Sequence, residues 1–516
     1  MTINERISLP LWKKIILYVI YIITFTIQLA IIFLVADLYI NYTTAATKNI
    51  GILYIITYII AIFYVLYIIA KPISANYKIT WCVLILLLPV PFCTLYSLNS
   101  LSRRLSKAKR DKIHKAIKIN KVLDNKEDLW EENKIGANLV SVVQHSTYAP
   151  VYKNTQFKFF ANIYDKYLDM LEEIKKAKRY ILLEYFIIGK GYLMDNLLPI
   201  LQEKGKEGIK IYILYDDIGS KGVMTNKLLR QISEIINCKI DSYQPLGLNF
   251  NLLVNYRDHR KIAVIDGKIA YCGGDNLADE YIHKKERFEY FRDNCGKYEG
   301  EVVNTFKNLF LEMWYTSTKE ILTLEDYKFE IKETKGYIMA FGDGPINNAD
   351  PGYDLFVSLI NSAKKYVYIS TPYLIIDDSL LSIISLKAKS GVDVRILMPK
   401  IPDKKSAFYM GRGNYQILLK AGVKIFEYTP GFNHAKNIIV DDEYVFLGTI
   451  NFDYRSLFLH YECGALIINN EEINTIKQDY LDALAVSELI SYEKWKAMPS
   501  YQKLIAFILN LFSTLF

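Results

Sequence analysis

Cysteine and histidine are both scarce in this chain, with six of each among 516 residues. The cysteines are scattered without a CxxC pair or a Cys/His spacing of the kind that holds zinc. This pattern excludes a disulfide scaffold and a structural zinc site, and we expect six reduced thiols. The apolar share of 51% excludes a disordered chain, and a chain of this length holds roughly two to four domains.

Positive charge is distributed unevenly along the chain. The net charge is +8, but the first 120 residues hold fourteen Lys or Arg and three acidic residues, an excess of eleven. The rest of the chain therefore carries a net charge of −3. A nucleic-acid-binding protein usually carries its basic excess over the folded domain, so the distribution argues against nucleic acid as a partner.

Three long runs without charge lie at the N-terminus, at residues 15–36, 50–70 and 79–96. Helices of these lengths would measure about 27 to 33 Å, close to the hydrocarbon thickness of a bilayer. Pro89 and Pro91 interrupt the third run, which fits a kinked span, a re-entrant segment or an interfacial helix. We therefore expect residues 1–100 to form a membrane anchor with two or three spans.

A basic segment follows, in the predicted linker at residues 101–135. Residues 103–118 hold eight Lys or Arg and one acid, Asp111. Such a segment beside an apolar span marks the cytoplasmic side and attracts anionic lipids; the alternative is a solvated helix face. The sequence thus predicts a multi-pass protein of the cell membrane whose remaining part is cytoplasmic. The N-terminus would lie outside with three spans and inside with two.

Beyond residue 136 strands alternate with helices, which is typical of an α/β domain. Residues 177–186 are echoed by 363–373, and residues 208–216 by 391–399. Each copy has the order helix, buried strand, helix, buried strand. We predict an α/β fold with two tandem repeats of mixed sheets flanked by helices, at residues 136–325 and 326–500, with a site at their interface. An apolar helix at residues 501–516 would dock on this core or lie on the bilayer.

A third repeated segment contains the candidate catalytic residues. The pattern HxKxxxxD occurs once in each copy. Two chance matches among six histidines have odds of roughly one in two thousand. A glycine follows each motif histidine by fourteen residues and an asparagine by seventeen. The candidate catalytic residues are His259, Lys261, Asp266, His434, Lys436 and Asp441.

Strand geometry places the histidine and lysine of each motif on one face. A two-residue turn at Asp266 and Gly267 would set residue 274 opposite His259, with residue 276 on the same face. The same arithmetic in the second copy sets residue 449 opposite His434. Small residues there would leave room for a phosphate. The candidate substrate-binding residues are Gly274, Asn276, Thr449 and Asn451.

The two motif aspartates fall in the predicted turns, so we assign them first to holding a loop or a basic partner. Orientation of each imidazole then needs another carboxylate, for which Asp293 and Glu462 are candidates. The other four histidines are interpreted as ordinary surface or core residues: His114, His145, His283 and His460.

Two His, two Lys and two Asn between the copies suit a phosphodiester substrate. One neutral imidazole can attack phosphorus while the other, protonated, gives its proton to the leaving alcohol. The ammonium and amide groups would neutralise charge on the phosphoryl oxygens. This set requires no metal and no cofactor.

With these motifs the sequence resembles the phospholipase D superfamily, which is characterised by the duplicated HxKxxxxD motif. Within that superfamily it resembles the bacterial cardiolipin synthases. The narrower match lies at residues 184–186, 215–220, 371–373 and 448–456, and in the apolar N-terminal segments. Phe291 stands where the family usually has tryptophan, and residues 15–36 form an apolar run beyond the usual two.

The resemblance implies a transferase that joins two phosphatidylglycerol molecules into cardiolipin and releases glycerol. The family's catalytic His, Lys and Asp carry over to the six motif residues, with His259 as nucleophile by analogy. A membrane-bound phospholipase D that hydrolyses the lipid is the alternative enzyme. A nuclease fits poorly with the −3 charge and the apolar spans, and a scaffold with an unused site fits poorly with two intact motifs.

Overall fold

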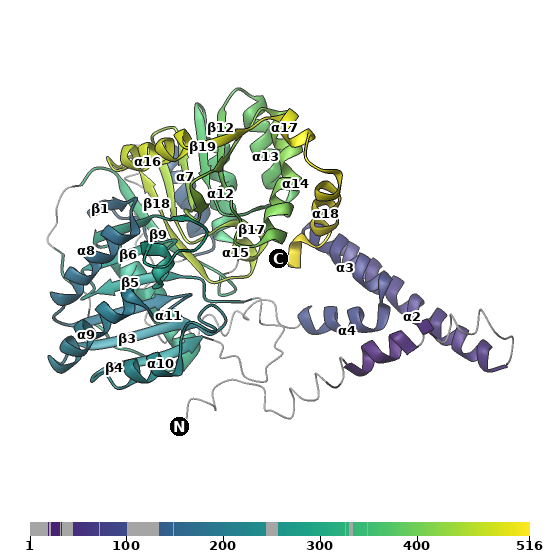
Figure 1. Ribbon diagram of the computed structural model, residues 1–516, viewed down its shortest axis with the longest axis horizontal. Coiled ribbons are helices and arrows are strands. Elements are labelled where there is room, and N and C mark those ends of the chain that lie inside the picture. Colours follow the sequence, from purple (N-terminus) through teal and green to yellow (C-terminus); the bar gives the residue numbers. More distant parts are fainter. Residues whose placement is uncertain are drawn as a thin grey trace. The chain divides into compact units, whose positions relative to one another are not determined.

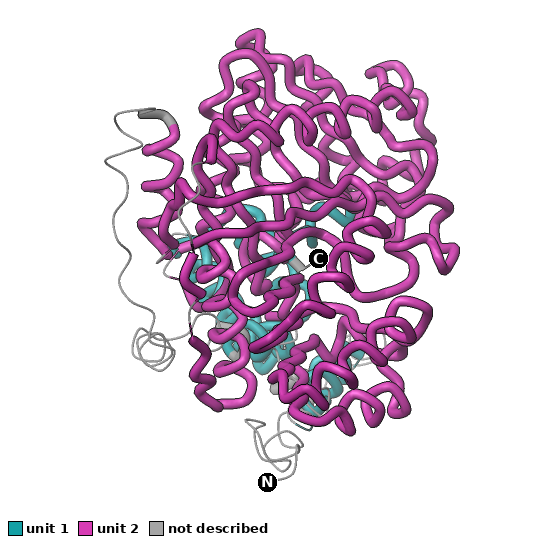
Figure 2. Tube along the Cα trace, turned by 90° about the vertical axis from the view of Figure 1, so that its left-hand side faces the viewer, with its two compact units in different colours: residues 1–104, 246–255, 508–516 teal, residues 105–245, 256–507 magenta. Residues whose placement is uncertain are grey.

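The computed structural model describes residues 19, 22–30, 32–33, 45–71, 73–100, 134–147, 149–243, 256–325, 327–329, 334–347 and 349–515. The chain forms two units (Figure 2). The first comprises residues 1–104, 246–255 and 508–516, and the second comprises residues 105–245 and 256–507. Both α/β repeats belong to the second unit.

The first unit contains the helices α2 (Ala45–Ala70), α3 (Ala75–Leu87) and α4 (Pro89–Ser100). Within α2, Ile52–Ala70 has a mean hydropathy of 2.6 and is the one described helix long and apolar enough to cross a membrane. The third apolar run lies on two helices that meet at Pro89, because proline cannot donate the N–H that continues a helix. With 13 residues, α3 measures about 20 Å, less than a bilayer's hydrocarbon thickness.

Two other N-terminal predictions fall partly or wholly outside the described residues. Of the run at residues 15–36, only residues 19, 22–30 and 32–33 are described, and they are helical. The basic segment at residues 103–118 lies outside the described residues.

The C-terminus ends in helix α18 (Ser500–Asn510) and the short turn η4 (Ser513–Leu515). Within the first unit, the hydroxyl of Thr80 on α3 donates to the carbonyl of Leu511 at 2.7 Å. The hydroxyl of Thr514 donates to that of Thr80 at 3.0 Å. The last residues therefore pack on an N-terminal helix, a placement that the sequence analysis did not anticipate.

The first repeat is built on a seven-stranded sheet with the order β1-β8-β6-β5-β2-β3-β4. The inner strand β2 pairs parallel with β3 and antiparallel with β5, the central strand of the sheet. Its elements are β1 (Thr155–Phe160), α8 (Ile163–Lys175), β2 (Tyr180–Tyr185), α9 (Tyr192–Lys206), β3 (Lys210–Asp216), α10 (Asn226–Ser233), β4 (Cys238–Tyr243), β5 (Lys261–Ile265), β6 (Ile269–Gly273), η3 (Asp279–Ile282), β7 (Tyr290–Arg292), β8 (Cys295–Gly300) and α11 (Val303–Thr318) (Figure 1).

The second repeat has the same strand order with one strand added at the edge, β9-β18-β16-β15-β10-β12-β13-β19. The predicted tandem α/β repeats are therefore confirmed. Its elements are β9 (Tyr337–Asp343), α12 (Pro351–Ser362), β10 (Tyr366–Ser370), β11 (Leu374–Ile375), α13 (Asp378–Lys389), β12 (Asp393–Pro399), α14 (Lys405–Ala421), β13 (Lys424–Tyr428), β14 (Gly431–Asn433), β15 (Asn437–Val440), β16 (Tyr444–Gly448), β17 (Phe452–Asp453), α15 (Tyr454–Phe458), β18 (Glu462–Ile468), α16 (Ile473–Ala485), β19 (Ser487–Ile490) and α17 (Tyr492–Lys496), and α7 (Lys134–Gln144) shares its core.

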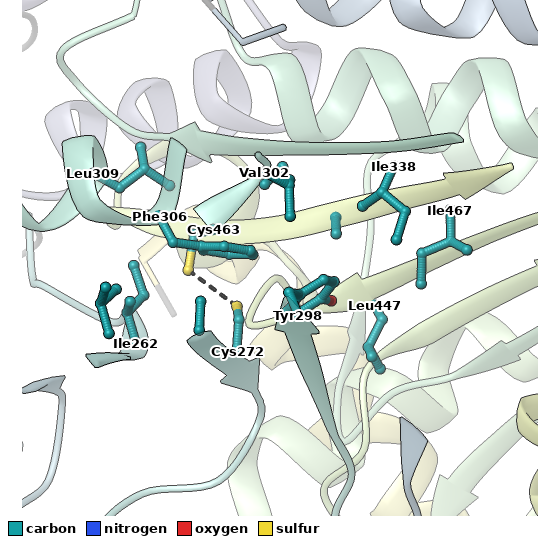
Figure 3. Close-up of a cluster of buried hydrophobic side chains, with 14 of the residues drawn as sticks. Ile262, Cys272, Tyr298, Val302, Phe306, Leu309, Ile338, Leu447, Cys463 and Ile467 are labelled. Atoms are coloured by element: carbon teal, nitrogen blue, oxygen red, sulfur yellow. Dashed lines mark hydrogen bonds between the residues drawn. The ribbon is translucent and has the colours of Figure 1, made fainter. Parts of the chain in front are cut away.

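One apolar cluster joins the two sheets. It contains Tyr298 of β8 and Phe306 of α11 from the first repeat, together with Leu447 of β16 and Ile467 of β18 from the second (Figure 3). Because all four side chains are fully buried, the removal of apolar surface from water holds the repeats together. The strands that carry the motif residues are thus fixed against each other.

The hairpin register predicted from a two-residue turn is wrong by one residue. Ile265 pairs with Ile269, and Val440 pairs with Tyr444, so each loop has three residues. Asp266 and Gly267 do adopt the left-handed backbone that an Asp-Gly turn needs, with φ of 58° and 68°. Lys268 follows them as an extra residue before pairing resumes. Gly274 and Thr449 therefore do not lie opposite their motif histidines.

Candidate active site

The two motif histidines occupy equivalent places, each just before an inner strand of its sheet. The main-chain N–H of His259 donates to the carbonyl of Tyr461 at 2.9 Å, and that of His434 donates to the carbonyl of Arg292 at 2.7 Å. Strand β14, next to His434, pairs parallel with β7 of the first repeat. The backbone of each histidine is therefore held by the other repeat.

The side chain of each motif histidine is also held by a residue of the other repeat. Nδ1 of His259 lies 2.9 and 3.0 Å from the two carboxylate oxygens of Glu462, and Nδ1 of His434 lies 2.6 Å from Oδ2 of Asp293. Asp293 and Glu462 are the carboxylates that the sequence suggested for this task, and each serves the histidine of the other repeat. Because an ionised carboxylate only accepts hydrogen bonds, Nδ1 carries the proton and Nε2 carries the free lone pair.

The motif lysines lie beside the histidines and are 1% exposed. Nζ of Lys261 donates to the carbonyl of His259 at 2.6 Å, and Nζ of Lys436 donates to that of His434. Each ammonium group has two further N–H donors for a substrate oxygen. Lys261 begins the inner strand β5 and Lys436 directly precedes the inner strand β15, so both cations are positioned by the centres of their sheets.

Burial and neighbouring cations set the protonation states. Burial, followed by the charges of Lys261 and Lys436, holds the pKa of His259 well below its usual range, and the same causes act on His434. Burial also lowers the pKa of Lys436 to about 7 and raises that of Asp293 to about 6. Both imidazoles are therefore neutral at pH 7 before an anionic substrate arrives.

The structure places the motif aspartates at the far ends of β5 and β15 from the histidines. The carboxylate of Asp266 accepts from three successive backbone N–H groups that lead into β2, and Asp441 does the same before β10. This geometry matches the loop-holding role we assigned first. The donors are Lys178, Arg179 and Tyr180 for Asp266, and Lys364, Lys365 and Tyr366 for Asp441.

Gly274 and Thr449 lie at the orienting carboxylates. A Cβ on Gly274 would stand 2.2 Å from Oδ1 of Asp293, so only glycine leaves space for that carboxylate. The hydroxyl of Thr449 donates to Oε2 of Glu462. Both residues therefore position the partners of the histidines.

The two asparagines are fixed by their own repeats. Nδ2 of Asn276 donates to the hydroxyl of Tyr281 at 2.7 Å, and its Oδ1 accepts from the N–H of Ile187 at 2.9 Å. Nδ2 of Asn451 donates to Ser456 at 3.1 Å. Within the described part of the chain, Oδ1 of Asn451 is buried without a hydrogen-bond partner.

Sequence reasoning missed His460, which it set aside as an ordinary residue. Its ring lies 5.5 Å from that of His259, measured between centroids. Nδ1 of His460 is 3.6 Å from Oε1 of Glu462. Its place two residues before the orienting carboxylate is the only signal in the sequence, and that signal depends on knowing that Glu462 faces His259.

Gly274→Ala is expected to lower kcat by about tenfold or more, because the new methyl group displaces the carboxylate that orients His434. Gly411→Ala is the matched control, since among the described residues its Cβ would meet nothing closer than 3.6 Å. Steady-state rates and thermal unfolding of both variants check this. Equal kcat in Gly274→Ala and the wild type would contradict the assigned space requirement.

Comparisons with known proteins show which family this chain belongs to. A family model described as "Cardiolipin synthase, PLD-like domain" matches residues 170–314 and 356–484. The chain is 33% identical to a cardiolipin synthase of Alkalihalophilus pseudofirmus over 448 residues, which covers 85% of this chain and 88% of that protein. It is 34% identical to a cardiolipin synthase of Geobacillus kaustophilus over 370 residues, 71% of this chain and 73% of that protein.

Two further proteins are similar to this chain, one in sequence and one in fold. An uncharacterized protein of Streptococcus mutans is 36% identical over 457 residues, which covers 87% of this chain and 99% of that protein. The crystal structure of phosphatidylserine synthase from Haemophilus influenzae superimposes with a TM-score of 0.56 at 16% identity, covering 73% of this chain and 98% of that one. At that identity the likeness concerns the fold alone.

Proposed function

The chain belongs to the cardiolipin synthase family with phospholipase D-like domains, and we propose that it transfers a phosphatidyl group between two phosphatidylglycerol molecules, giving cardiolipin and glycerol. It is a phosphatidyltransferase. The mechanism rests on one observation. The carboxylate that binds Nδ1 of each motif histidine comes from the other repeat, and Nε2 of both histidines is left free to react. The alternative, hydrolysis to phosphatidic acid, is not favoured by the family or by its named relatives.

In the first step Nε2 of His259 attacks the phosphorus of the donor lipid. The bond from phosphorus to the glycerol headgroup breaks, and the departing oxygen takes a proton from Nε2 of His434. The products are free glycerol and a phosphatidyl group bound to His259. His434 takes up this proton at Nε2 from solvent when the lipid binds, because the negative charge of the lipid phosphate offsets the burial and the neighbouring cations that lower its pKa.

In the second step the headgroup hydroxyl of another phosphatidylglycerol attacks the same phosphorus. His434 accepts the hydroxyl proton through Nε2, and the bond between His259 and phosphorus breaks. Cardiolipin leaves and both histidines return to their starting states. Lys261 and Lys436 stabilise the charge on the phosphoryl oxygens in both steps.

The intermediate offers a direct test of the proposed nucleophile. Acid-labile label from phosphatidylglycerol carrying radioactive phosphate should appear on His259 after rapid quenching, located by peptide mass spectrometry under alkaline conditions. Label on His434 instead would reverse the two roles. Absence of any labelled histidine during turnover would argue against covalent catalysis.

Lys436 gives the proposal a pH signature. Its pKa of about 7 means that its ammonium charge, present below pH 7, is lost as the pH rises through that value. We therefore expect kcat/KM to fall on the alkaline side of about pH 7. Lys436→Arg should work more slowly and show a shallower alkaline decline, because a guanidinium stays protonated while His434 still has to take up its proton.

Initial rates of glycerol release at low phosphatidylglycerol, measured across pH, check this prediction. Lys176→Arg is a suitable control, because the Lys176 side chain is 66% exposed. The same alkaline limb in Lys436→Arg and in the wild type would assign that limb to another group.

For the cellular setting, the proposal is a multi-pass protein of the cell membrane with both repeats on the cytoplasmic side. Helix α2 supports a membrane location, since Ile55 and Phe63 on it are 58% and 68% exposed. The basic segment at residues 103–118 supports the cytoplasmic orientation and contact with anionic lipids. Protease treatment of sealed vesicles tests this: the repeats should be cleaved in inverted vesicles and protected in right-side-out ones.

A further inference from the structure

A third histidine stands beside the proposed nucleophile without any task in phosphoryl transfer. The side chain of His460 is 12% exposed, and among the residues that the structure describes neither of its buried ring nitrogens has a hydrogen-bond partner. A buried imidazole normally has at least one partner, because an unsatisfied polar group is unfavourable away from water. The two free nitrogens of His460 therefore call for an explanation.

The surroundings of His460 have the composition of a metal site. One ring nitrogen from each of His259 and His460 and one carboxylate oxygen of Glu462 lie within 4.8 Å of one another. A tetrahedral zinc ion with bonds of about 2.0 to 2.2 Å has its ligand atoms roughly 3.3 Å apart. Since Nδ1 of His460 is already 3.6 Å from Glu462, small side-chain rotations would bring the three groups to that spacing.

We propose that His259, His460 and Glu462 bind a divalent transition metal such as Zn²⁺, and that the bound metal inhibits the enzyme. Two imidazoles and one carboxylate are ligands that zinc prefers, and water can fill the fourth position. The inhibitory part rests on the proposed role of His259 as nucleophile. The metal has no part in the reaction itself.

Inhibition follows from the coordination. If Nε2 of His259 binds the metal, its lone pair can no longer attack phosphorus. If Nδ1 binds, its proton leaves to solvent, Glu462 becomes a metal ligand, and the bound cation withdraws electron density from Nε2. In the first case metal and donor lipid compete for the same nitrogen, so a higher mole fraction of phosphatidylglycerol should relieve the inhibition. In the second case the lipid still reaches Nε2 but reacts more slowly, so more lipid should not relieve it.

The local charges set the strength of this site. Glu462 contributes one negative charge, whereas Lys261 and Lys436 are close enough to lower the pKa of His259 and will repel a divalent cation. We therefore expect binding weaker than in a structural zinc site, and reversal by a chelator. Loss of His460 removes one of three ligands and leaves the pair between His259 and Glu462 intact.

The experiment uses the full chain in detergent micelles with Co²⁺ and Zn²⁺ as probes. Co²⁺ should give the visible absorption of a tetrahedral site in the wild type and in His145→Asn, an exposed histidine that serves as control. His460→Asn should lose this absorption. The Zn²⁺ concentration for half-inhibition, relative to each protein's own rate in chelator, should rise at least about tenfold in His460→Asn.

His460→Gln provides a second variant, and thermal unfolding shows whether each variant is folded. No Co²⁺ absorption in the wild type, or equal absorption in the folded His460 variants, would overturn the metal site. Equal Zn²⁺ sensitivity of wild type and variants would also overturn it. Binding with full retention of activity would overturn the inhibitory part and count against His259 as nucleophile, whereas a chain that binds no metal leaves the proposed function untouched.

Discussion

Replacing either His259 or His434 with alanine is expected to lower the rate of cardiolipin formation by about 10⁴-fold or more. His259→Ala removes the atom that bonds to phosphorus, and His434→Ala removes the group that protonates the departing glycerol. The two losses should not add in the double variant, because both groups act in the same two steps. Initial rates with vesicles of phosphatidylglycerol measure all three proteins.

The two single variants should also differ from each other. His434→Ala retains the nucleophile and should still form some phosphatidyl-enzyme slowly, whereas His259→Ala should form none. His145→Ala, at an exposed position, should keep the wild-type rate. A rate within tenfold of the wild type in either motif variant would contradict the assignment of that histidine.

The second large loss of activity is expected when the carboxylate that binds either motif histidine from the other repeat is replaced by an amide. Glu462→Gln and Asp293→Asn preserve size but should each lower kcat by about 10²- to 10⁴-fold. An amide cannot hold the Nδ1 proton as a carboxylate does, so the imidazole can shift its proton to Nε2 and lose the reactive lone pair. Steady-state kinetics give the size of the loss, and thermal unfolding shows whether it reflects folding.

NMR can show which carboxylate binds which histidine, because the chain has only six histidines to label with ¹⁵N. Glu462→Gln should change the ring resonances of His259 and leave those of His434 nearly unchanged, and Asp293→Asn should do the reverse. Signals are assigned by single histidine substitutions. A change confined to the histidine of the same repeat in each variant would contradict the exchange.

Much of the fold followed from the sequence, because a duplicated order of buried strands and helices leaves few α/β arrangements. The motif predicted which histidines and lysines the two repeats bring together, and the odd spacing placed Asp266 and Asp441 away from them. The hairpin register failed by one residue, since the third loop residue after an Asp-Gly turn has no clear sequence signal.

The pairing of carboxylates with histidines was beyond sequence reasoning. Asp293 follows His259 at 34 residues and Glu462 follows His434 at 28, so spacing alone favours pairs within a repeat. The observed exchange depends on backbone pairing between repeats, as at β7 and β14. The role of His460 was hidden for the same reason, because its neighbour His259 lies 201 residues earlier in the chain.

The central claim is that this chain transfers phosphatidyl groups between lipids, and mass spectrometry of its products tests that claim most directly. Vesicles of phosphatidylglycerol are incubated with the wild-type chain, His259→Ala or His434→Ala, and lipids and glycerol are quantified. We predict one glycerol for each cardiolipin with the wild type, no detectable cardiolipin with either variant, and at most one glycerol per chain with His434→Ala. Phosphatidic acid without cardiolipin would contradict the account and make the chain a hydrolase.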